Sequence, residues 1–135
     1  MFSVKMALIS VAAGGFFMPF AKPAHLPDPT EGHYPFLGCT LASHYGVGDG
    51  FHGLTTANGE TYNAYDISAA HKTLPFGTNL VVQNQENGAS VTVRINDRGP
   101  FVEGRDLDLS YAAFRAIEDP STGVVRVCYY LKVVQ

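Results

Sequence analysis

The sequence has no tryptophan, only two cysteines and few basic residues. Lysine and arginine together number 9 against 12 acidic residues, which gives a formal net charge of -3. Such a chain lacks the clustered positive charge with which proteins bind nucleic acid or anionic lipid. Its histidines, cysteines and acidic residues show no spacing typical of a metal site, and no phosphate-binding glycine loop precedes an expected helix. We therefore expect no nucleic acid partner, no metal and no cofactor.

No hydrophobic run is long enough to cross a membrane. The longest, Met6–Phe20, is apolar except for Ser10 and follows Lys5. A run of this length behind a basic residue is typical of a secretory signal peptide, so we predict one over residues 1–24 and no integral membrane span. The proline-rich segment that follows is expected to be an extended connector over residues 25–38. An uncleaved N-terminal anchor is the alternative interpretation of the leader.

The remaining residues, 39–135, are enough for one domain with its own core. Short apolar or alternating segments separated by turn residues predict a mainly β fold of the barrel type. Six strands are expected, over Thr40–Tyr45, Asp66–Ala70, Asn79–Gln83, Ser90–Asn96, Asp106–Leu109 and Val124–Val133. Asn87-Gly88 predicts a hairpin turn within residues 84–89, and Ser110 predicts the N-cap of one short helix over Tyr111–Ile117.

The two cysteines lie in the first and last expected strands, Cys39 at the start of one and Cys128 within the other. A closed barrel would bring those strands together, so we expect a single disulfide, formed in an oxidising compartment. The alternative is a lipid anchor at Cys39, because Phe36-Leu37-Gly38-Cys39 has the form of a lipoprotein box. Polar residues 27–33 separate that box from the hydrophobic run, so we favour the disulfide.

The stretch Asn96-Asp97-Arg98-Gly99-Pro100-Phe101 ends the fourth expected strand. Alternation along the strand places Val91, Val93 and Ile95 on one face, and Asp97 continues that row where the strand meets a Gly-Pro turn. A carboxylate at the edge of a sheet, beside a loop, is in a position where folds often carry function. The purely structural alternative for Asp97 is a local turn or an ion pair with Arg98.

Five sequence blocks, in the same order, resemble the rare lipoprotein A (RlpA) family. The blocks are Ala42–Gly46, Thr55–Tyr62, Ala69–Thr78, Asn96–Phe101 and Arg105–Ala113. The resemblance runs from about Cys39 to Val133, and it implies a six-stranded double-psi β-barrel. It also implies a lytic transglycosylase that cuts the glycan strands of peptidoglycan, preferring strands free of stem peptides. In two respects the sequence departs from the family. The usual tryptophan of the first block is His44, which alters a possible stacking surface for sugar, and the C-terminal glycan-binding domain of many relatives is not included.

The resemblance supplies three catalytic candidates, Asp97, Glu60 and His71. We expect Asp97 to be the acid and base because it ends a rigid strand, with Glu60 as the second carboxylate; the reverse assignment is open. His71 is expected to orient a carboxylate or to bind a sugar hydroxyl. Without the resemblance, Glu60 would be interpreted as a solvated loop acid and His71 as a structural histidine.

Aromatic side chains are candidates for the walls of a sugar-binding groove, because their faces pack against the apolar side of pyranose rings. These candidates are Tyr45, Tyr62, Phe51 and Phe101, and Arg98 completes the expected substrate-binding set. Each aromatic residue has the alternative of being part of the core. Asp106 and Asp108 are assigned structural roles in a strand and its turn.

The implied reaction needs neither water nor a cofactor. The 6-hydroxyl of the muramic acid attacks its own anomeric carbon, so one carboxyl group can protonate the leaving oxygen and then accept the hydroxyl proton. That carboxyl group must start protonated, a state that burial or a neighbouring carboxylate favours. We expect a monomer, periplasmic or cell-wall associated, whose partner is the glycan strand. The alternatives are a non-catalytic, expansin-like polysaccharide-binding module, a hydrolase that uses water, and a scaffold or inhibitor that keeps the fold.

Overall fold

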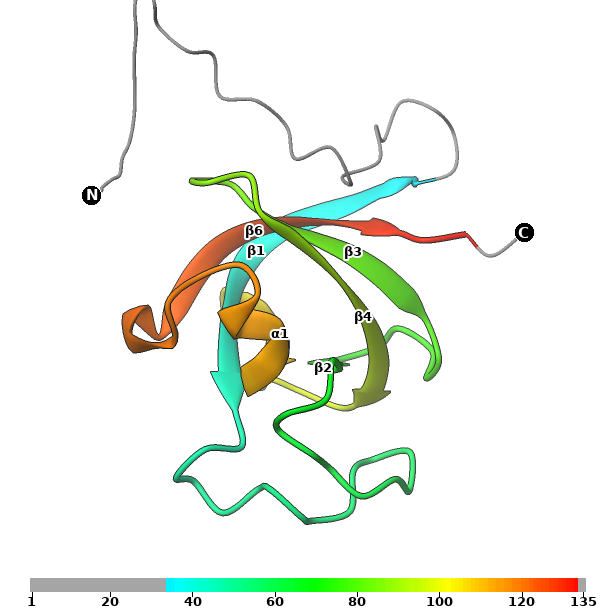
Figure 1. Ribbon diagram of the computed structural model, residues 1–135. Helices are drawn as coiled ribbons and strands as arrows, with labels where there is room; N and C mark the ends of the chain where they lie inside the picture. The colour runs from blue at the N-terminus through cyan, green and yellow to red at the C-terminus, as the bar shows by residue number, and fades with distance from the viewer. Residues whose placement is uncertain (1–33, 134–135) are drawn as a thin grey trace, which may run out of the picture.

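The computed structural model describes residues 34–133, which form a closed barrel of six strands (Figure 1). The strands are β1 (Phe36–Tyr45), β2 (Ala69–His71), β3 (Asn79–Asn84), β4 (Ser90–Asp97), β5 (Arg105–Ser110) and β6 (Val124–Leu131). Around the barrel they follow the order β1-β5-β2-β4-β3-β6, and β6 pairs with β1 to close it. The pairs β1–β5 and β2–β4 are parallel, and the other pairs are antiparallel. The predicted mainly β, six-stranded barrel is confirmed.

The strands differ from the sequence prediction mainly at their ends. β1 starts at Phe36, so the last residues of the connector expected over 25–38 belong to the sheet and pair with β6. β2 covers only Ala69–His71, because the residues before it form turns instead of pairing with a neighbouring strand. The predicted signal peptide, residues 1–24, and the connector as far as residue 33 lie outside the described residues.

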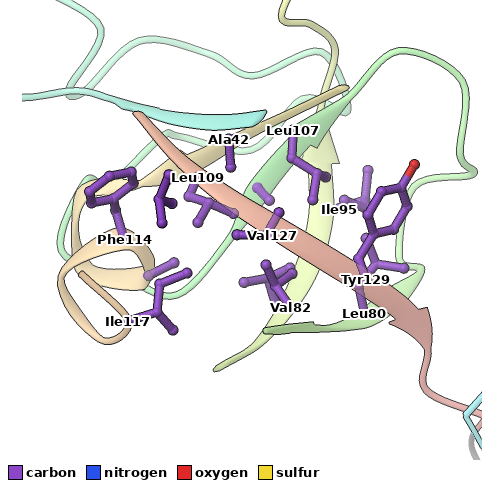
Figure 2. Packing of buried hydrophobic residues seen from close by; sticks show 14 residues of the cluster. Ala42, Leu80, Val82, Ile95, Leu107, Leu109, Phe114, Ile117, Val127 and Tyr129 are labelled. Carbon is purple, nitrogen blue, oxygen red and sulfur yellow. The ribbon is translucent and has the colours of Figure 1, made fainter. Parts of the chain in front are cut away.

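The core fills the barrel with side chains from alternate strand positions (Figure 2). The larger fully buried strand residues of this cluster are Leu80 and Val82 from β3, Val93 and Ile95 from β4, Leu107 and Leu109 from β5, and Val127 from β6. Full burial of one such side chain contributes roughly 1.5–3 kcal/mol. Because Leu107 and Leu109 both point into this core, strand alternation turns the residue between them, Asp108, to the outer face of the barrel.

A short helix, α1 (Tyr111–Arg115), follows β5 directly and packs on the barrel core. Ser110 is its N-cap, as predicted, and its hydroxyl accepts a hydrogen bond of 3.1 Å from a backbone N–H of the first turn. Phe114 and Ile117 are buried in the same core cluster as the strand residues (Figure 2). The helix ends two residues before the predicted end, and the 3-10 helix η2 (Pro120–Thr122) leads on to β6.

The first and last strands are joined covalently. Cys39 and Cys128 lie directly opposite each other in the β1–β6 pair and form a disulfide, as predicted. The Cys39 sulfur is thereby engaged and is not available to carry a lipid. None of the helices in the described part of the chain has the length and apolar character needed to cross a membrane.

The longest connection, residues 46–68 between β1 and β2, extends beyond the ends of β1 and β4 (Figure 1). Backbone hydrogen bonds fold part of it back on itself, from Gly53 N to Tyr62 O at 2.8 Å and from Tyr62 N to Leu54 O at 2.7 Å. This loop therefore has a defined shape, and it brings its residues to the end of the barrel where β4 places Asp97.

Candidate active site

A cleft of about 320 Å³ lies at this end of the barrel. Its walls come from the ends of β1 and β4, from β2 and β5, and from the two loops that follow β1 and β4. The lining residues are Tyr45, Phe51, Leu54, Thr55, Ala70, Asp97, Arg98, Gly99, Pro100, Phe101 and Asp108. A largely apolar cleft with a few convergent polar groups, at the low end of the usual volume range for ligand sites, is a candidate for binding part of a substrate.

Asp97, the last residue of β4, is held by three hydrogen-bond donors. Its Oδ2 accepts from the Tyr45 hydroxyl at 3.0 Å, and its Oδ1 accepts from the backbone N–H groups of Ala57 and Arg98, both at 2.9 Å. The donors come from β1, from the 46–68 loop and from the next residue of the chain. The carboxylate is therefore an acceptor in every one of these contacts, and its orientation in the cleft is fixed.

Tyr45 is supported from behind by Tyr62. The two rings stack with centroids 4.3 Å apart, and the Tyr62 hydroxyl donates to the Tyr45 carbonyl at 2.7 Å. Burial, followed by the nearby Asp97 carboxylate, raises the pKa of Tyr45, so this hydroxyl stays protonated and donates. Tyr62 itself is only 2% exposed and does not line the cleft. Tyr45 thus lies in the wall of the cleft, whereas Tyr62 lies beneath that wall.

Glu60 lies outside the cleft lining, on the loop that covers β4. Its carboxylate accepts hydrogen bonds from both terminal nitrogens of Arg94, at 2.8 and 3.0 Å, and from the side-chain amide nitrogen of Asn96 at 3.1 Å. These hydrogen bonds, that from Arg94 above all, hold the pKa of Glu60 at about 2. Glu60 is therefore an ionised anchor that fastens the loop to β4. The same loop supplies the Ala57 N–H to Asp97.

His71, the last residue of β2, is buried and also lies outside the cleft lining. Its Nδ1 accepts hydrogen bonds from the backbone N–H groups of Thr73 and Leu74, at 3.1 and 3.0 Å. Burial lowers the pKa of His71, which suits a neutral ring with its proton on Nε2. The ring therefore shapes the turn after β2. Its neighbour Ala70 is the residue of β2 that reaches the cleft.

Arg98 and Phe101, two of the predicted substrate-binding residues, both line the cleft. The Arg98 guanidinium lies over the ring of Phe76, 3.9 Å from its centroid, and donates to the His71 carbonyl at 3.2 Å. Phe101 is 81% exposed, and Phe51 on the opposite loop is 51% exposed. Large aromatic faces left open at the mouth of a cleft are suited to packing against a sugar ring.

Asp108 lines the cleft, although only a structural role was predicted for it from the sequence. It lies at the middle of β5 and accepts a hydrogen bond from the Ser43 hydroxyl at 3.2 Å. Burial raises the pKa of Asp108 to about 6. The alternation of Leu107, Asp108 and Leu109 could have indicated this position. It predicts that Asp108 faces away from the core, and β5 has a neighbouring strand on each side.

The family described as lytic transglycolase matches residues 38–129. The chain belongs to this family. A probable endolytic peptidoglycan transglycosylase RlpA from Synechocystis sp. is 57% identical over 95 residues, covering 70% of this chain and 28% of the relative. The endolytic peptidoglycan transglycosylase RlpA from Pseudomonas aeruginosa is 54% identical over 86 residues, covering 64% of this chain and 25% of that protein. The chain thus spans about a quarter of the length of these relatives.

Solved structures share the barrel. An expansin from Clavibacter michiganensis superposes with a TM-score of 0.56 at 26% identity, covering 73% of this chain and 50% of the expansin. A mutant of that expansin has been solved in complex with cellohexaose. The Streptomyces papain inhibitor superposes with a TM-score of 0.57 at 22% identity, covering 73% of this chain and 98% of the inhibitor, and this likeness concerns the fold alone.

In this member of the lytic transglycolase family, the side chain of His44 does not face the cleft. Its Nε2 lies 3.0 Å from the Pro120 carbonyl oxygen, and its ring packs edge-on against Phe114 of α1 with centroids 4.7 Å apart. The expectation that His44 alters a sugar-stacking surface of the site was therefore wrong, because that side of β1 faces the helix. Within residues 34–133, no three His, Cys, Asp or Glu side chains gather closely enough to hold a metal ion.

Proposed function

We propose that this domain is an endolytic peptidoglycan lytic transglycosylase. It cleaves the bond between N-acetylmuramic acid and N-acetylglucosamine and leaves a 1,6-anhydro end. The observation that carries the proposal is the rigidly held Asp97 carboxylate, which opens into a cleft flanked by exposed aromatic rings. Membership of the family and the names of the similar proteins support the same reaction class.

The reaction breaks one bond and forms one within the same sugar. The bond between C1 of the muramic acid and O4 of the next sugar breaks, and O4 leaves with the electron pair and takes a proton. The O6 hydroxyl oxygen of the muramic acid then bonds to C1 and gives its proton to a carboxylate. Since nucleophile and electrophile belong to one ring, no water is consumed, and the protein need only hold the ring and move protons. Asp97 is the residue to which we assign proton transfer.

The other candidates act around Asp97. Phe101 presents an exposed ring along which glycan units lie, Tyr45 forms a buried part of the cleft wall, and Arg98 offers guanidinium N–H groups there. Glu60 holds the loop that donates to Asp97, and His71 shapes the turn after β2 and accepts from Arg98 through its carbonyl. Both are positioning residues in this proposal.

The domain is expected to act outside the cytoplasm, in the periplasm or at the cell wall. The Cys39–Cys128 disulfide supports this location, because such bonds persist in oxidising compartments. We further propose that glycan strands without stem peptides are the preferred substrate. A bare strand can lie along the aromatic mouth of the cleft without lactyl-linked peptides competing for the same space.

Product analysis tests the function directly. Purified protein is incubated with peptidoglycan stripped of stem peptides and with intact peptidoglycan, and the released fragments are analysed by mass spectrometry. Fragments with 1,6-anhydro ends, formed faster from the stripped material, are the expected result. Reducing ends formed with uptake of water would instead identify a hydrolase. Glycan binding with no product of either kind would favour the expansin-like binding module, the alternative to which the likeness with the expansin points.

A further inference from the structure

Two carboxyl groups flank one small residue in the sheet. In the register of the barrel, Ala70 of β2 is opposite Asp97 of β4 on one side and opposite Asp108 of β5 on the other. β2 lies between β4 and β5, with neighbouring strands about 4.8 Å apart, and the β2–β4 register shifts between Ala69 and Ala70. All three residues line the cleft. The methyl group of Ala70 leaves the space between the carboxyl groups open to a substrate.

The two carboxyl groups have different surroundings. Asp97 has three hydrogen-bond donors, whereas Asp108 has one, the Ser43 hydroxyl at 3.2 Å. Tyr45 donates a hydrogen bond to Asp97 and lines the same cleft as both aspartates. One carboxyl group thus has three donors, and the other is partly buried with a single hydrogen bond to stabilise its charge. Two carboxyl groups in environments of this kind divide the roles of acid and base in many glycan-cleaving enzymes.

We propose that Asp108 is a second catalytic residue, the one that gives the proton to the departing O4, while Asp97 receives the proton of the O6 hydroxyl. This inference rests on the proposed function. In the step, the C1–O4 bond breaks and O4 takes both bonding electrons and the Asp108 proton. The O6 oxygen bonds to C1, and its proton goes to the Asp97 carboxylate. Exchange of one proton with solvent at each carboxyl group restores the starting state, and no other reactant is needed.

The charged groups around Asp108 agree with the role of a proton donor. Burial is the main cause that raises the pKa of Asp108 to about 6, and the nearby Asp49 carboxylate acts in the same direction. The Ser43 hydrogen bond, the Arg105 guanidinium and His44 act against it. Tyr45 and Tyr62, which also face it, are neutral because burial raises the pKa of both. A fraction of Asp108 is therefore protonated in mildly acidic solution.

The experiment compares two aspartates of the same strand. Asp108→Asn keeps the size of the side chain and an acceptor for Ser43 but removes the proton donor, so anhydro-product formation on stripped glycan is expected to fall about 10²–10⁴-fold. Asp106→Asn is the matched control. Asp106 is on β5, its side chain is half exposed, and its carboxylate faces Lys72 outside the cleft lining. Its substitution is expected to leave the rate within a few-fold of the wild type.

A second variant keeps the carboxyl group and changes only its hydrogen bond. Wild-type kcat/KM is expected to fall as the pH rises through about 6, because the donor loses its proton. Ser43→Ala removes the one hydrogen bond that stabilises the charged form, so this falling limb should move to higher pH with activity retained. This shift also decides the question if Asp108→Asn fails to fold.

Four outcomes would overturn the assignment. They are near wild-type activity in folded Asp108→Asn, an equal loss in Asp106→Asn, an unmoved limb in Ser43→Ala, and a wild type that makes no anhydro product. Only the last outcome also rejects the proposed function. In the first three the domain remains a lytic transglycosylase whose proton donor is another group, so the two failures are distinguishable.

Discussion

Glu60 and Asp97 are both carboxylates, but different partners hold them and give them different tasks. Asp97 is oriented by three donors and opens into the cleft. Glu60 is held in its ionised form by hydrogen bonds from Arg94 and Asn96 outside the cleft lining, and the loop on which it lies donates to Asp97 through Ala57. In the proposed reaction, a substitution at Glu60 therefore acts through the loop, whereas one at Asp97 removes the proton acceptor.

Rates of the two amide variants separate these tasks. Asp97→Asn is expected to lower anhydro-product formation about 10²–10⁴-fold, because an amide cannot accept and release the proton. Glu60→Gln loses the charge opposite Arg94 but keeps the oxygen that can accept from Asn96, so a smaller loss is expected. Initial rates on stripped glycan at one pH measure both. An equal loss in folded Glu60→Gln would mean that Glu60 itself takes part in proton transfer.

Acid unfolding tests the Glu60 ion pair separately from catalysis. The pKa of Glu60 is lowered to about 2 from an unfolded value of about 4.3, so its contribution to stability is complete above about pH 4.3 and is lost as the pH falls towards 2. The side chains of Glu60 and Arg94 are 41% and 43% exposed, so solvent limits this contribution to about 1 kcal/mol. Denaturant unfolding at pH 7 should show Glu60→Gln to be slightly less stable than the wild type. The difference should vanish near pH 2, and a constant difference would contradict the ion pair.

His71 is expected to matter as an acceptor of backbone hydrogen bonds. His71→Ala removes the partner of the Thr73 and Leu74 N–H groups and should lower the free energy of unfolding by about 1–3 kcal/mol. His71→Asn offers a side-chain oxygen to the same turn and should recover part of that loss. Because burial lowers the pKa of His71, the wild type should also lose stability as the pH falls below about 6.5, and both variants should lack this dependence. Equal stability of the two variants would argue against the acceptor role.

At the scale of elements, the turn after β1 depends on the close approach of Gly46 to Tyr62. A Cβ atom at Gly46 would lie 2.5 Å from the Tyr62 ring and 2.7 Å from the Ala64 Cβ, and the backbone there has φ +108. Gly46→Ala should therefore destabilise the domain by about 2 kcal/mol or more, from the clash and the strained backbone together. Gly48→Ala is the matched control, because Gly48 also has positive φ, +77, but a Cβ added there would meet no atom within 4 Å beyond its chain neighbours. Thermal unfolding of both should show the larger loss at Gly46; similar losses would mean that the contact with Tyr62 is unimportant.

Most elements could be predicted from the sequence because they depend on local patterns. Alternation in residues 90–96 predicts β4, and Ser110 caps α1 as expected. The start of β1 was missed because Phe36 follows prolines and joins the sheet only by pairing with β6. The outward position of Asp108 follows from alternation, but its burial does not. That burial requires knowing that β1 and β2 flank β5 and that residues from the 46–68 loop contribute to the same cleft.

The whole molecule separates stability from function by location. The apolar cluster lies inside the barrel, and the candidate site lies at the ends and outer faces of strands, beneath loops. The parallel β2–β4 pair and the antiparallel β2–β5 pair set Asp97 and Asp108 on either side of Ala70. Residues from distant parts of the sequence thus meet because β2 pairs with both β4 and β5 within the closed barrel. Anything that loosens closure should therefore affect both stability and the cleft.

The disulfide is the covalent part of that closure. Cys39 and Cys128 are 89 residues apart in the sequence, and a cross-link over that separation restricts the unfolded chain by up to about 4–5 kcal/mol. Cys39→Ser with Cys128→Ser should lower the unfolding temperature markedly, while the folded fraction should keep measurable transglycosylase activity, since neither cysteine lines the cleft. In the wild type recovered from the periplasm, thiol-reactive labels should modify neither cysteine until a reductant is added. Quantitative labelling of Cys128 together with a lipid on Cys39 would contradict the bond and restore the lipid anchor as the explanation of the first cysteine.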